Sequence, residues 1–159
     1  MSNTPQPIEI LLVEDNPGDA YLTTDLLEKS HVLNRMTTVR DGEEAINFLR
    51  RKRPYENAPN PDLILLDLNL PKKDGRQVLA EIKQDPFLKV IPVVILTSSE
   101  AEQDVLRSYE LHANSYISKP VKLESFIEVI HQIESFWLSI VKLPRQHADQ
   151  RGTDKRTAR

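Results

Sequence analysis

The chain has 159 residues, of which 39% are hydrophobic and 28% charged, so it can form one globular domain with a core of its own. Its formal net charge of −3 gives no electrostatic reason to expect nucleic acid as a partner. It contains no cysteine, which excludes disulfides, thiolate nucleophiles and cysteine-ligated zinc.

Five short segments have the pattern of buried strands, because they are rich in branched aliphatic residues and are followed by turn or capping signals. In chain order they are 8–14, 36–40, 63–66, 91–97 and 115–119, and the second is the weakest. Between and after them, apolar residues have helical spacing over 17–31, 43–52, 76–84, 100–111 and 122–141. Strands that alternate with helices form βαβ units, so the sequence predicts a doubly wound, five-stranded parallel sheet of flavodoxin-like architecture.

The two ends of the chain differ from the part between them. We expect an N-terminal tail over 1–7, one domain over 8–142, and a polar, disordered tail over 143–159, with no output module after the domain. The N-terminus lacks the pattern of a secretory signal, and no apolar run approaches the ~18 residues that span a bilayer. We therefore expect a soluble, cytoplasmic protein without a membrane partner.

Polar residues stand at the ends of four of the five apolar runs. Glu14 ends the first run and Asp15 follows it. Asp67 follows the third run, Thr97 ends the fourth, and Lys119 ends the fifth. Because ligands of parallel sheets bind at the carboxyl ends of the strands, we expect these side chains to converge on one edge.

The predicted cluster has the chemistry of a site for magnesium and phosphate. Carboxylates that lie together raise one another's pKa, and a divalent cation removes this conflict. Magnesium prefers oxygen ligands and takes one or two carboxylates together with a phosphate oxygen. Glu14, Asp15 and Asp67, with a carbonyl from the turn after Asp67, suit Mg²⁺, and Mn²⁺ could replace it. Lys119 and Thr97 would supply a cation and a hydroxyl for the phosphate.

Two other kinds of phosphate site fit the sequence less well. A flavin or nucleotide site needs a loop rich in Ser, Thr and Gly after the first strand, whereas Glu14 and Asp15 would repel a phosphate there. An Asp-nucleophile phosphatase uses a second Asp two residues after the nucleophile as general acid. Asn69 stands at that position and cannot donate a proton in this way. We therefore expect acceptance of a phosphoryl group without turnover of phosphate esters.

Four motifs, in this order and with this spacing, resemble the receiver domains of two-component response regulators. They are "LLVEDNPGD", "LILLDLNLPKKDG", "VVILTSS" and "SYISKP", and the resemblance covers roughly residues 8–140. It implies that Asp67 accepts a phosphoryl group from the phosphohistidine of a partner kinase. It also implies a signalling protein that hydrolyses its phosphoryl group slowly, and not an enzyme in the usual sense.

The resemblance implies a role for each matching residue of the site. Asp15, Asp67 and the carbonyl of Asn69 would hold magnesium directly, and Glu14 would act through water. Lys119 would pair with the phosphoryl oxygens.

The same resemblance implies residues that transmit and time the signal. Lys119 would precede a cis peptide bond to Pro120. Thr97 would swing to the phosphoryl group, and Tyr116 would follow by turning inward. Asn69 and Ser99 occupy the two variable positions that tune the lifetime of the phosphorylated state.

Further motifs are similar to those of the single-domain response regulators of bacterial, cyanobacterial-type phytochromes. They are "LILLDLNLPKKDGR", "SYEL" and "IESFWL". The likeness implies a phytochrome as the partner histidine kinase. The alternative is a phosphorylation-independent interaction module with a receiver fold, against which the intact set of site residues argues.

The last predicted helix carries more apolar surface than one core contact needs. Phe126, Ile130, Ile133 and Trp137 form one core-facing stripe. A helix of about 20 residues is ~30 Å long, which exceeds the ~17–20 Å of a typical strand. We therefore predict that its end, with Phe136, Trp137 and Ile140, forms a homodimer or partner face together with the helix at 100–111 and the last strand.

Overall fold

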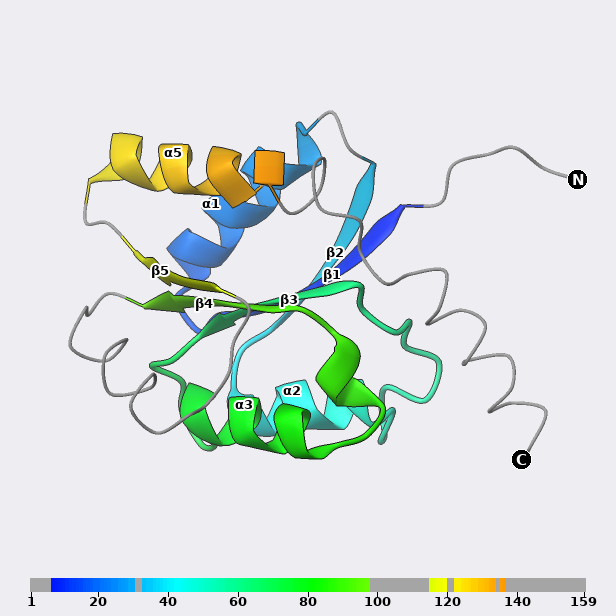
Figure 1. Ribbon diagram of the computed structural model, residues 1–159. Helices are drawn as coiled ribbons and strands as arrows, with labels where there is room; N and C mark the ends of the chain where they lie inside the picture. Colours follow the sequence, from blue (N-terminus) through cyan, green and yellow to red (C-terminus); the bar gives the residue numbers. More distant parts are fainter. Residues whose placement is uncertain (1–6, 31–32, 98–114, 120–121, 134, 137–159) are drawn as a thin grey trace, which may run out of the picture.

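The computed structural model describes residues 7–30, 33–97, 115–119, 122–133 and 135–136. Its centre is a parallel sheet with helices on both faces (Figure 1). The strands are β1 (Ile8–Val13), β2 (Asn34–Val39), β3 (Leu63–Asp67), β4 (Val93–Thr97) and β5 (Ser115–Ser118), in the order β2-β1-β3-β4-β5. The predicted parallel α/β sheet is confirmed. The strand order changes direction between β1 and β3, which is where sheets of this type bind ligands.

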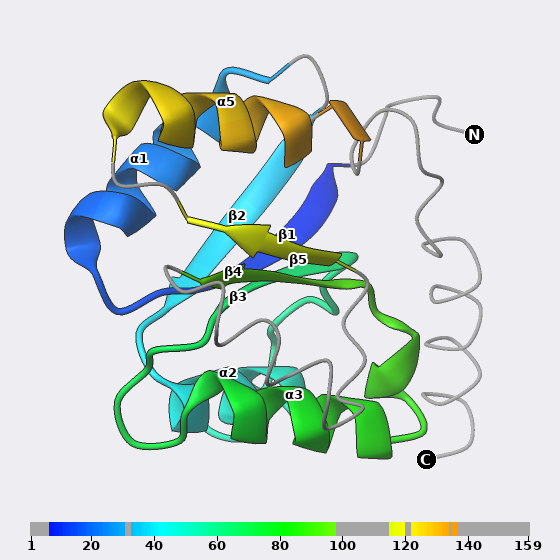
Figure 2. The ribbon, with the colours of Figure 1, turned by 60° about the vertical axis from the view of Figure 1, so that its left-hand side comes forward.

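The helices form two layers, one on each face of the sheet (Figures 1 and 2). One layer holds α1 (Pro17–Glu28) and α5 (Leu123–Ile133), and the other holds α2 (Gly42–Leu49) and α3 (Gly75–Gln84). A short 3-10 helix, η1 (Leu88–Val90), precedes β4. The helix expected over 100–111 and the last residues of the helix expected over 122–141 lie outside the described residues. Where the structure describes the chain, no helix is long and apolar enough to cross a bilayer.

The core has two halves because alternate residues of each strand face opposite sides of the sheet. Leu11, Ile64 and Ile95 pack with the helices of the α2 and α3 layer. Leu12, Leu65 and Leu96 pack on the other side, with Phe126, Ile130 and Ile133 of α5. The core-facing stripe of the last helix is therefore confirmed for these three residues, while Trp137 lies outside the described part of the chain.

Side-chain caps fix where three helices begin, close to the carboxyl edge of the sheet. Asn16 Oδ1 accepts a hydrogen bond from the backbone N–H of Asp19 at 3.0 Å, and Asp41 Oδ1 accepts one from Glu44 at 2.7 Å. Asp74 forms a reciprocal capping box with Gln77. Asp41 is therefore the N-cap of α2.

The glycine after two of these caps allows the backbone to approach the turn after β3. A Cβ atom on Gly42 would lie 1.8 Å from the carbonyl oxygen of Lys73, and one on Gly75 would lie 2.5 Å from that of Asp67. The first residues of α2 and α3 therefore pack directly against the segment 67–73. This contact holds the turn that carries Asp67 and Asn69 from two sides.

The boundaries near β2 differ from the expected ones for a local reason. α1 ends at Glu28 and not at residue 31, and β2 begins at Asn34 and not at residue 36. The side-chain amide of Asn34 donates to the carbonyl oxygen of Leu27 at 2.8 Å, which satisfies an acceptor in the last turn of α1. Asn34 is also in register with Ile8, so the same residue closes the helix and opens the strand.

Candidate active site

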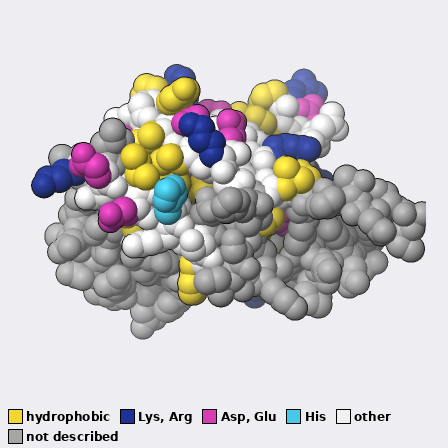
Figure 3. Space-filling view, turned by 90° about the horizontal axis from the view of Figure 1, so that it is seen from above, with side chains coloured by type: hydrophobic (Ala, Val, Ile, Leu, Met, Phe, Trp, Pro, Cys, Tyr) yellow, Lys and Arg dark blue, Asp and Glu magenta, His cyan; other side chains and the backbone are white. Residues whose placement is uncertain are grey.

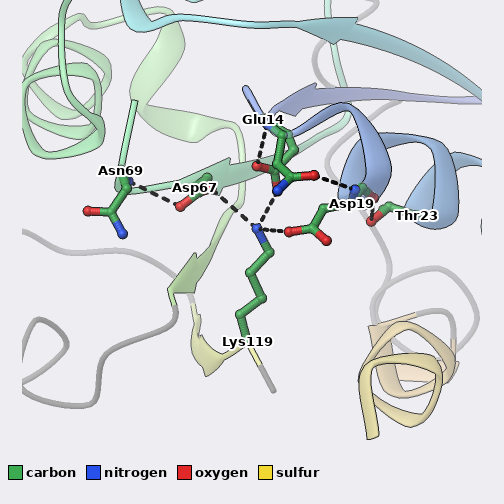
Figure 4. Close-up of polar contacts among 7 residues, drawn as sticks. Glu14, Asp19, Thr23, Asp67, Asn69 and Lys119 are labelled. Atoms are coloured by element: carbon green, nitrogen blue, oxygen red, sulfur yellow. Dashed lines mark hydrogen bonds and ion pairs between the residues drawn. The ribbon is translucent and has the colours of Figure 1, made fainter. Parts of the chain in front are cut away.

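Three strand ends bring one cation and two carboxylates together at the carboxyl edge of the sheet (Figure 4). Glu14 follows β1, Asp67 is the last residue of β3, and Lys119 follows β5. Lys119 Nζ lies 2.6 Å from Glu14 Oε1 and 3.3 Å from Asp67 Oδ2. The side chains of Glu14 and Asp67 are only 2% and 8% exposed, so both carboxylates depend on this ammonium for compensation.

A third carboxylate on the same ammonium comes from a helix. Asp19, in the first turns of α1, places Oδ2 2.7 Å from Lys119 Nζ. The backbone of Asp19 is fixed on both sides, because its N–H donates to Asn16 and its carbonyl accepts from Thr23 Oγ1 at 2.8 Å. We did not expect a role for Asp19 from the sequence. The available signal was its place at the third position of a helix whose N-cap follows β1.

The two oxygens of Asp67 have different partners. Oδ1 accepts a hydrogen bond from the backbone N–H of Asn69 at 3.1 Å, and Oδ2 faces Lys119. The backbone behind Asp67 is fixed as well, because Gly75 N–H donates to the carbonyl of Leu68 at 3.0 Å. The carboxylate at the end of the buried strand is therefore held in one orientation.

The acidic residues at this edge form a donor set that fits a hard divalent cation. Carboxylate oxygens of Glu14, Asp15 and Asp67 lie within 4.8 Å of one another. Asp15 is exposed, whereas the other two are buried, so the group opens toward solvent at Asp15. Oxygen-only donors of this kind suit Mg²⁺ and Mn²⁺ better than a softer metal. The part expected of the Asn69 carbonyl in this set stays a prediction.

Burial and charge shift the pKa values of the two buried partners of this cluster. Burial, together with the neighbouring Asp67, raises the pKa of Glu14 from 4.5 to about 7, although Lys119 acts to lower it. Burial alone lowers the pKa of Lys119, but the hydrogen bonds to Asp19 and Glu14 and the charges of Asp67 and Glu14 raise it above its ordinary value. The ammonium is therefore permanently charged near neutral pH, while Glu14 exchanges a proton there.

Several residues expected at the site cannot be placed with their side chains. Thr97 ends β4 and Tyr116 lies in β5, but their side chains fall outside the described part of the structure. Ser99, Pro120, Trp137 and Ile140 lie outside the described residues altogether. Phe136 is described, and it is 52% exposed just beyond α5. The roles expected of these residues stay predictions.

Comparison with known proteins agrees with this geometry. The family model for the response regulator receiver domain matches residues 10–131. Response regulator Rcp1 of Synechocystis sp. is 54% identical over 138 residues, which cover 87% of this chain and 94% of Rcp1.

Among solved structures, the chain is similar to Mn²⁺-bound Rcp1, with 54% identity, a TM-score of 0.82 and coverage of 87% of this chain and 99% of that one. It is also similar to the phosphorylated cyanobacterial phytochrome response regulator RcpA, with 53% identity, a TM-score of 0.82 and the same coverage. The bacteriophytochrome response regulator AtBRR gives 45% identity and a TM-score of 0.70, over 87% of this chain and all of that one. The chain therefore belongs to the response regulator receiver family.

Proposed function

We propose that this protein accepts a phosphoryl group from a histidine kinase onto Asp67. The observation that carries the proposal is the state of this carboxylate: it is buried, oriented by the N–H of Asn69, and in contact with Lys119. A carboxylate oxygen of Asp67 attacks the phosphorus atom of the phosphohistidine. The P–O bond forms while the P–N bond breaks, and the electron pair of that bond returns to the imidazole. Water later hydrolyses the aspartyl phosphate slowly and regenerates the carboxylate.

Two features around Asp67 help to hold the phosphoryl group: the cation Lys119 and a backbone turn that is fixed by packing. Lys119 contacts its oxygens, because the ammonium already lies beside Asp67 Oδ2. The backbone of the turn stays in place, because Gly75 leaves no gap between α3 and the carbonyl of Asp67. Compensation of charge at a preorganised site is the main contribution that a protein makes to phosphoryl transfer.

We infer that Mg²⁺, or Mn²⁺ in its place, is held by Asp15, Asp67 and the carbonyl of Asn69, with Glu14 acting through water. The close approach of the three carboxylates supports this inference, as does the relative Rcp1, whose solved structure is described as Mn²⁺-bound. A bound divalent cation supplies neutralisation of the negative charge on the carboxylates and the phosphoryl oxygens.

We propose that Thr97 and Tyr116 change conformation when Asp67 is phosphorylated. We also propose that the peptide bond between Lys119 and Pro120 is cis. The pairing of β4 with β5 supports this pathway, because it sets Thr97 beside Ser118 and Tyr116 beside Ile95. Asn69 and Ser99 would set the lifetime of the phosphorylated state. Asn69 is exposed next to Asp67, where its side chain can influence an attacking water.

We propose that the kinase is a phytochrome and that the two proteins meet in the cytoplasm. The similarity to RcpA and AtBRR supports the phytochrome as partner.

We further propose that 8–142 form the receiver domain and that two copies associate through a face with Phe136, Trp137 and Ile140. Figure 3 shows hydrophobic side chains among charged ones on the face that α1 and α5 cover, and the exposure of Phe136 fits a contact there. Sedimentation that finds a monomer at tens of micromolar in both phosphorylation states contradicts the dimer.

Labelling with a small phosphate donor separates this function from a phosphorylation-independent interaction module. The protein is incubated with Mg²⁺ and acetyl phosphate, and we expect an adduct that alkali and hydroxylamine remove. Asp67→Asn should lose the label, whereas Asp25→Asn, which removes a half-buried carboxylate of α1 that pairs with Lys29, should keep it. No adduct on the wild-type protein, or full labelling of Asp67→Asn, contradicts the proposal.

A further inference from the structure

Lys119 uses its three N–H donors on three carboxylates, and these contacts are unequal. Glu14 lies at 2.6 Å and Asp19 at 2.7 Å, whereas Asp67 lies at 3.3 Å. An ammonium has three donors, so all of them face an acceptor. The two shorter contacts come from the residue that follows β1 and from α1. Lys119 is therefore held by Glu14 and Asp19, and its contact with Asp67 is the loosest of the three.

Asp19 can contact Lys119 because Glu14, and not Asp19, accepts the hydrogen bond from the backbone N–H of the N-cap residue of α1. An acidic residue at the third position of a helix commonly folds back onto the N–H of the N-cap residue. In α3, Gln77 does this, accepting from the N–H of Asp74 at 3.0 Å. In α1, the N–H of Asn16 donates instead to Glu14 Oε2 at 3.2 Å. Glu14 thus serves the helix start and Lys119 at once, and Asp19 turns toward the lysine.

We propose that Asp19 is a positioning residue, which together with Glu14 holds Lys119 so that its third donor points at Asp67 and at the phosphoryl group that Asp67 takes up. The proposal rests on the proposed function of Asp67. When the phosphoryl group arrives, one of its oxygens replaces Asp67 Oδ2 as the acceptor of that third donor. The contacts to Glu14 and Asp19 remain, so the ammonium does not need to be oriented anew.

The surroundings of the pair agree with this role. The side chain of Lys119 is 11% exposed and that of Asp19 is 36% exposed, so the pair is partly shielded from solvent. Burial lowers the pKa of Lys119, and the hydrogen bond to Asp19 comes first among the interactions that outweigh it. A lysine side chain has a long flexible stem, so two fixed anchors remove much of its freedom.

Substitution of Asp19 has two opposite effects on the rate of labelling: it removes an anchor of Lys119, and it removes a negative charge near Asp67. Because the effects have opposite signs, the proposal can be tested. Removal of one negative charge near Asp67 favours the approach of an anionic phosphate donor and should speed labelling. Loss of an anchor for Lys119 should slow it, because the ammonium is then less often directed at the phosphoryl oxygens. Alanine removes both the charge and the acceptor, whereas asparagine removes the charge and keeps a neutral acceptor.

The test measures the rate of labelling by acetyl phosphate with Mg²⁺ as a function of donor concentration. For Asp19→Ala we expect the rate at saturating donor to fall on the order of three- to tenfold, while the half-saturating concentration stays the same or falls because one negative charge is lost. Asp19→Asn should fall less, and Asp25→Asn, on the same helix, should stay within about twofold of the wild type. Equal or faster labelling of both Asp19 variants, relative to the wild type, overturns the proposal.

A second readout follows the lysine itself in protein with ¹⁵N-labelled lysine. Lys119→Met identifies the ammonium signal of Lys119 by its loss. We expect this signal to be slow in hydrogen exchange in the wild type and fast in Asp19→Ala, and unchanged exchange overturns the proposal. If far-ultraviolet circular dichroism shows that Asp19→Ala does not fold, Asp19→Asn decides by the same criteria. Wild-type protein that takes no label overturns the proposed function itself, whereas normal labelling of the Asp19 variants overturns this inference alone.

Discussion

The ammonium of Lys119 lies 2.6 Å from the carboxylate of Glu14, although the two residues are 105 positions apart in the chain. β5 and β1 lie on opposite sides of β3 and β4 in the sheet order, so this contact bridges the carboxyl edge across the end of β3. Asp67 ends β3, so it lies between Glu14 and Lys119 along the order of the strand ends. Among the described residues, Lys119 is the cation that contacts these carboxylates, so the metal-free site depends on it for charge compensation.

Lys119→Met should destabilise the metal-free protein. The variant leaves two buried carboxylates without a cation, and loss of one partner of a buried ion pair costs up to roughly 3–5 kcal/mol. Protonation of Glu14 limits the loss, so we expect about 2 kcal/mol in the free energy of unfolding by urea. Mg²⁺ should then stabilise the variant more than the wild type.

The matched control for this prediction is Lys29→Met. Lys29 pairs with Asp25 at 3.0 Å on the surface of α1, with the lysine side chain 72% exposed. Such a pair contributes little, so the control should unfold almost as the wild type does. Equal stability of Lys119→Met and the wild type without metal contradicts the assigned charge balance.

The stability of the metal-free protein should depend on pH through Glu14. Its pKa is raised from 4.5 to about 7 in the folded state, so between these values the folded chain binds more protons than the unfolded chain. The free energy of unfolding therefore falls as pH rises through this window. The contribution of Glu14 is at most about 3–4 kcal/mol, because one pKa unit corresponds to about 1.4 kcal/mol.

Glu14→Gln is the variant that isolates this dependence. It cannot ionise, so its free energy of unfolding should decline less between pH 4.5 and 7 than that of the wild type. The measurement is urea unfolding at a series of pH values in the presence of a chelator. Parallel curves for the two proteins contradict a raised pKa of Glu14.

Gly75→Ala should disturb the turn that carries Asp67. The added Cβ would lie 2.5 Å from the carbonyl oxygen of Asp67 and 2.6 Å from Leu68 Cα, so backbone has to move. Overpacking of this kind costs about 1–3 kcal/mol, and we expect a loss in that range together with slower labelling of Asp67. Thermal unfolding and acetyl phosphate labelling measure the two effects.

Gly18→Ala provides the comparison for Gly75→Ala. A Cβ on Gly18 would meet only the side-chain oxygen of Asn16, at 3.3 Å. That side chain can shift slightly, and alanine favours the helix, so stability should change by less than about 1 kcal/mol. If both variants unfold alike, the turn is not held by its contact with α3.

Tyr55 should tie the loop after α2 back to that helix. Its hydroxyl donates to Glu44 Oε1 at 2.6 Å, and its ring packs edge-on against Phe48 with centroids 5.3 Å apart. Tyr55→Phe keeps the ring contact and should cost about 1 kcal/mol, whereas Tyr55→Ala should cost about 3 kcal/mol. Equal losses in chemical denaturation of the two variants contradict a separate contribution of the ring, and an unchanged stability of Tyr55→Phe contradicts one of the hydroxyl.

The sequence allowed prediction of the parts of the fold that depend on periodicity and on topology. The runs around Leu11, Leu65 and Ile95 are apolar on both faces, which is the pattern of parallel strands covered on both sides. Once such strands are assigned, Glu14, Asp67 and Lys119 must lie at the same edge. No knowledge of side-chain packing is needed for that step.

The residues that were missed act through contacts that no local pattern shows. Asp19 lies on a helix, and its contact with Lys119 depends on where α1 crosses the sheet edge. Gly42 follows an N-cap, a position where many residues fit, and only the approach of Lys73 requires a glycine there. Tyr55 lies in an irregular loop whose path is set by Glu44 and Phe48.

Chemical reduction of the phosphorylated protein tests the central claim most directly. Borohydride converts an aspartyl phosphate into homoserine, so the acceptor is marked by a stable change in one residue. After treatment with acetyl phosphate and Mg²⁺, we predict homoserine at position 67, at an end of β3, and aspartate at positions 15, 19 and 62. Homoserine at any of those three positions, or at no position in a protein that carries the label, would contradict the account.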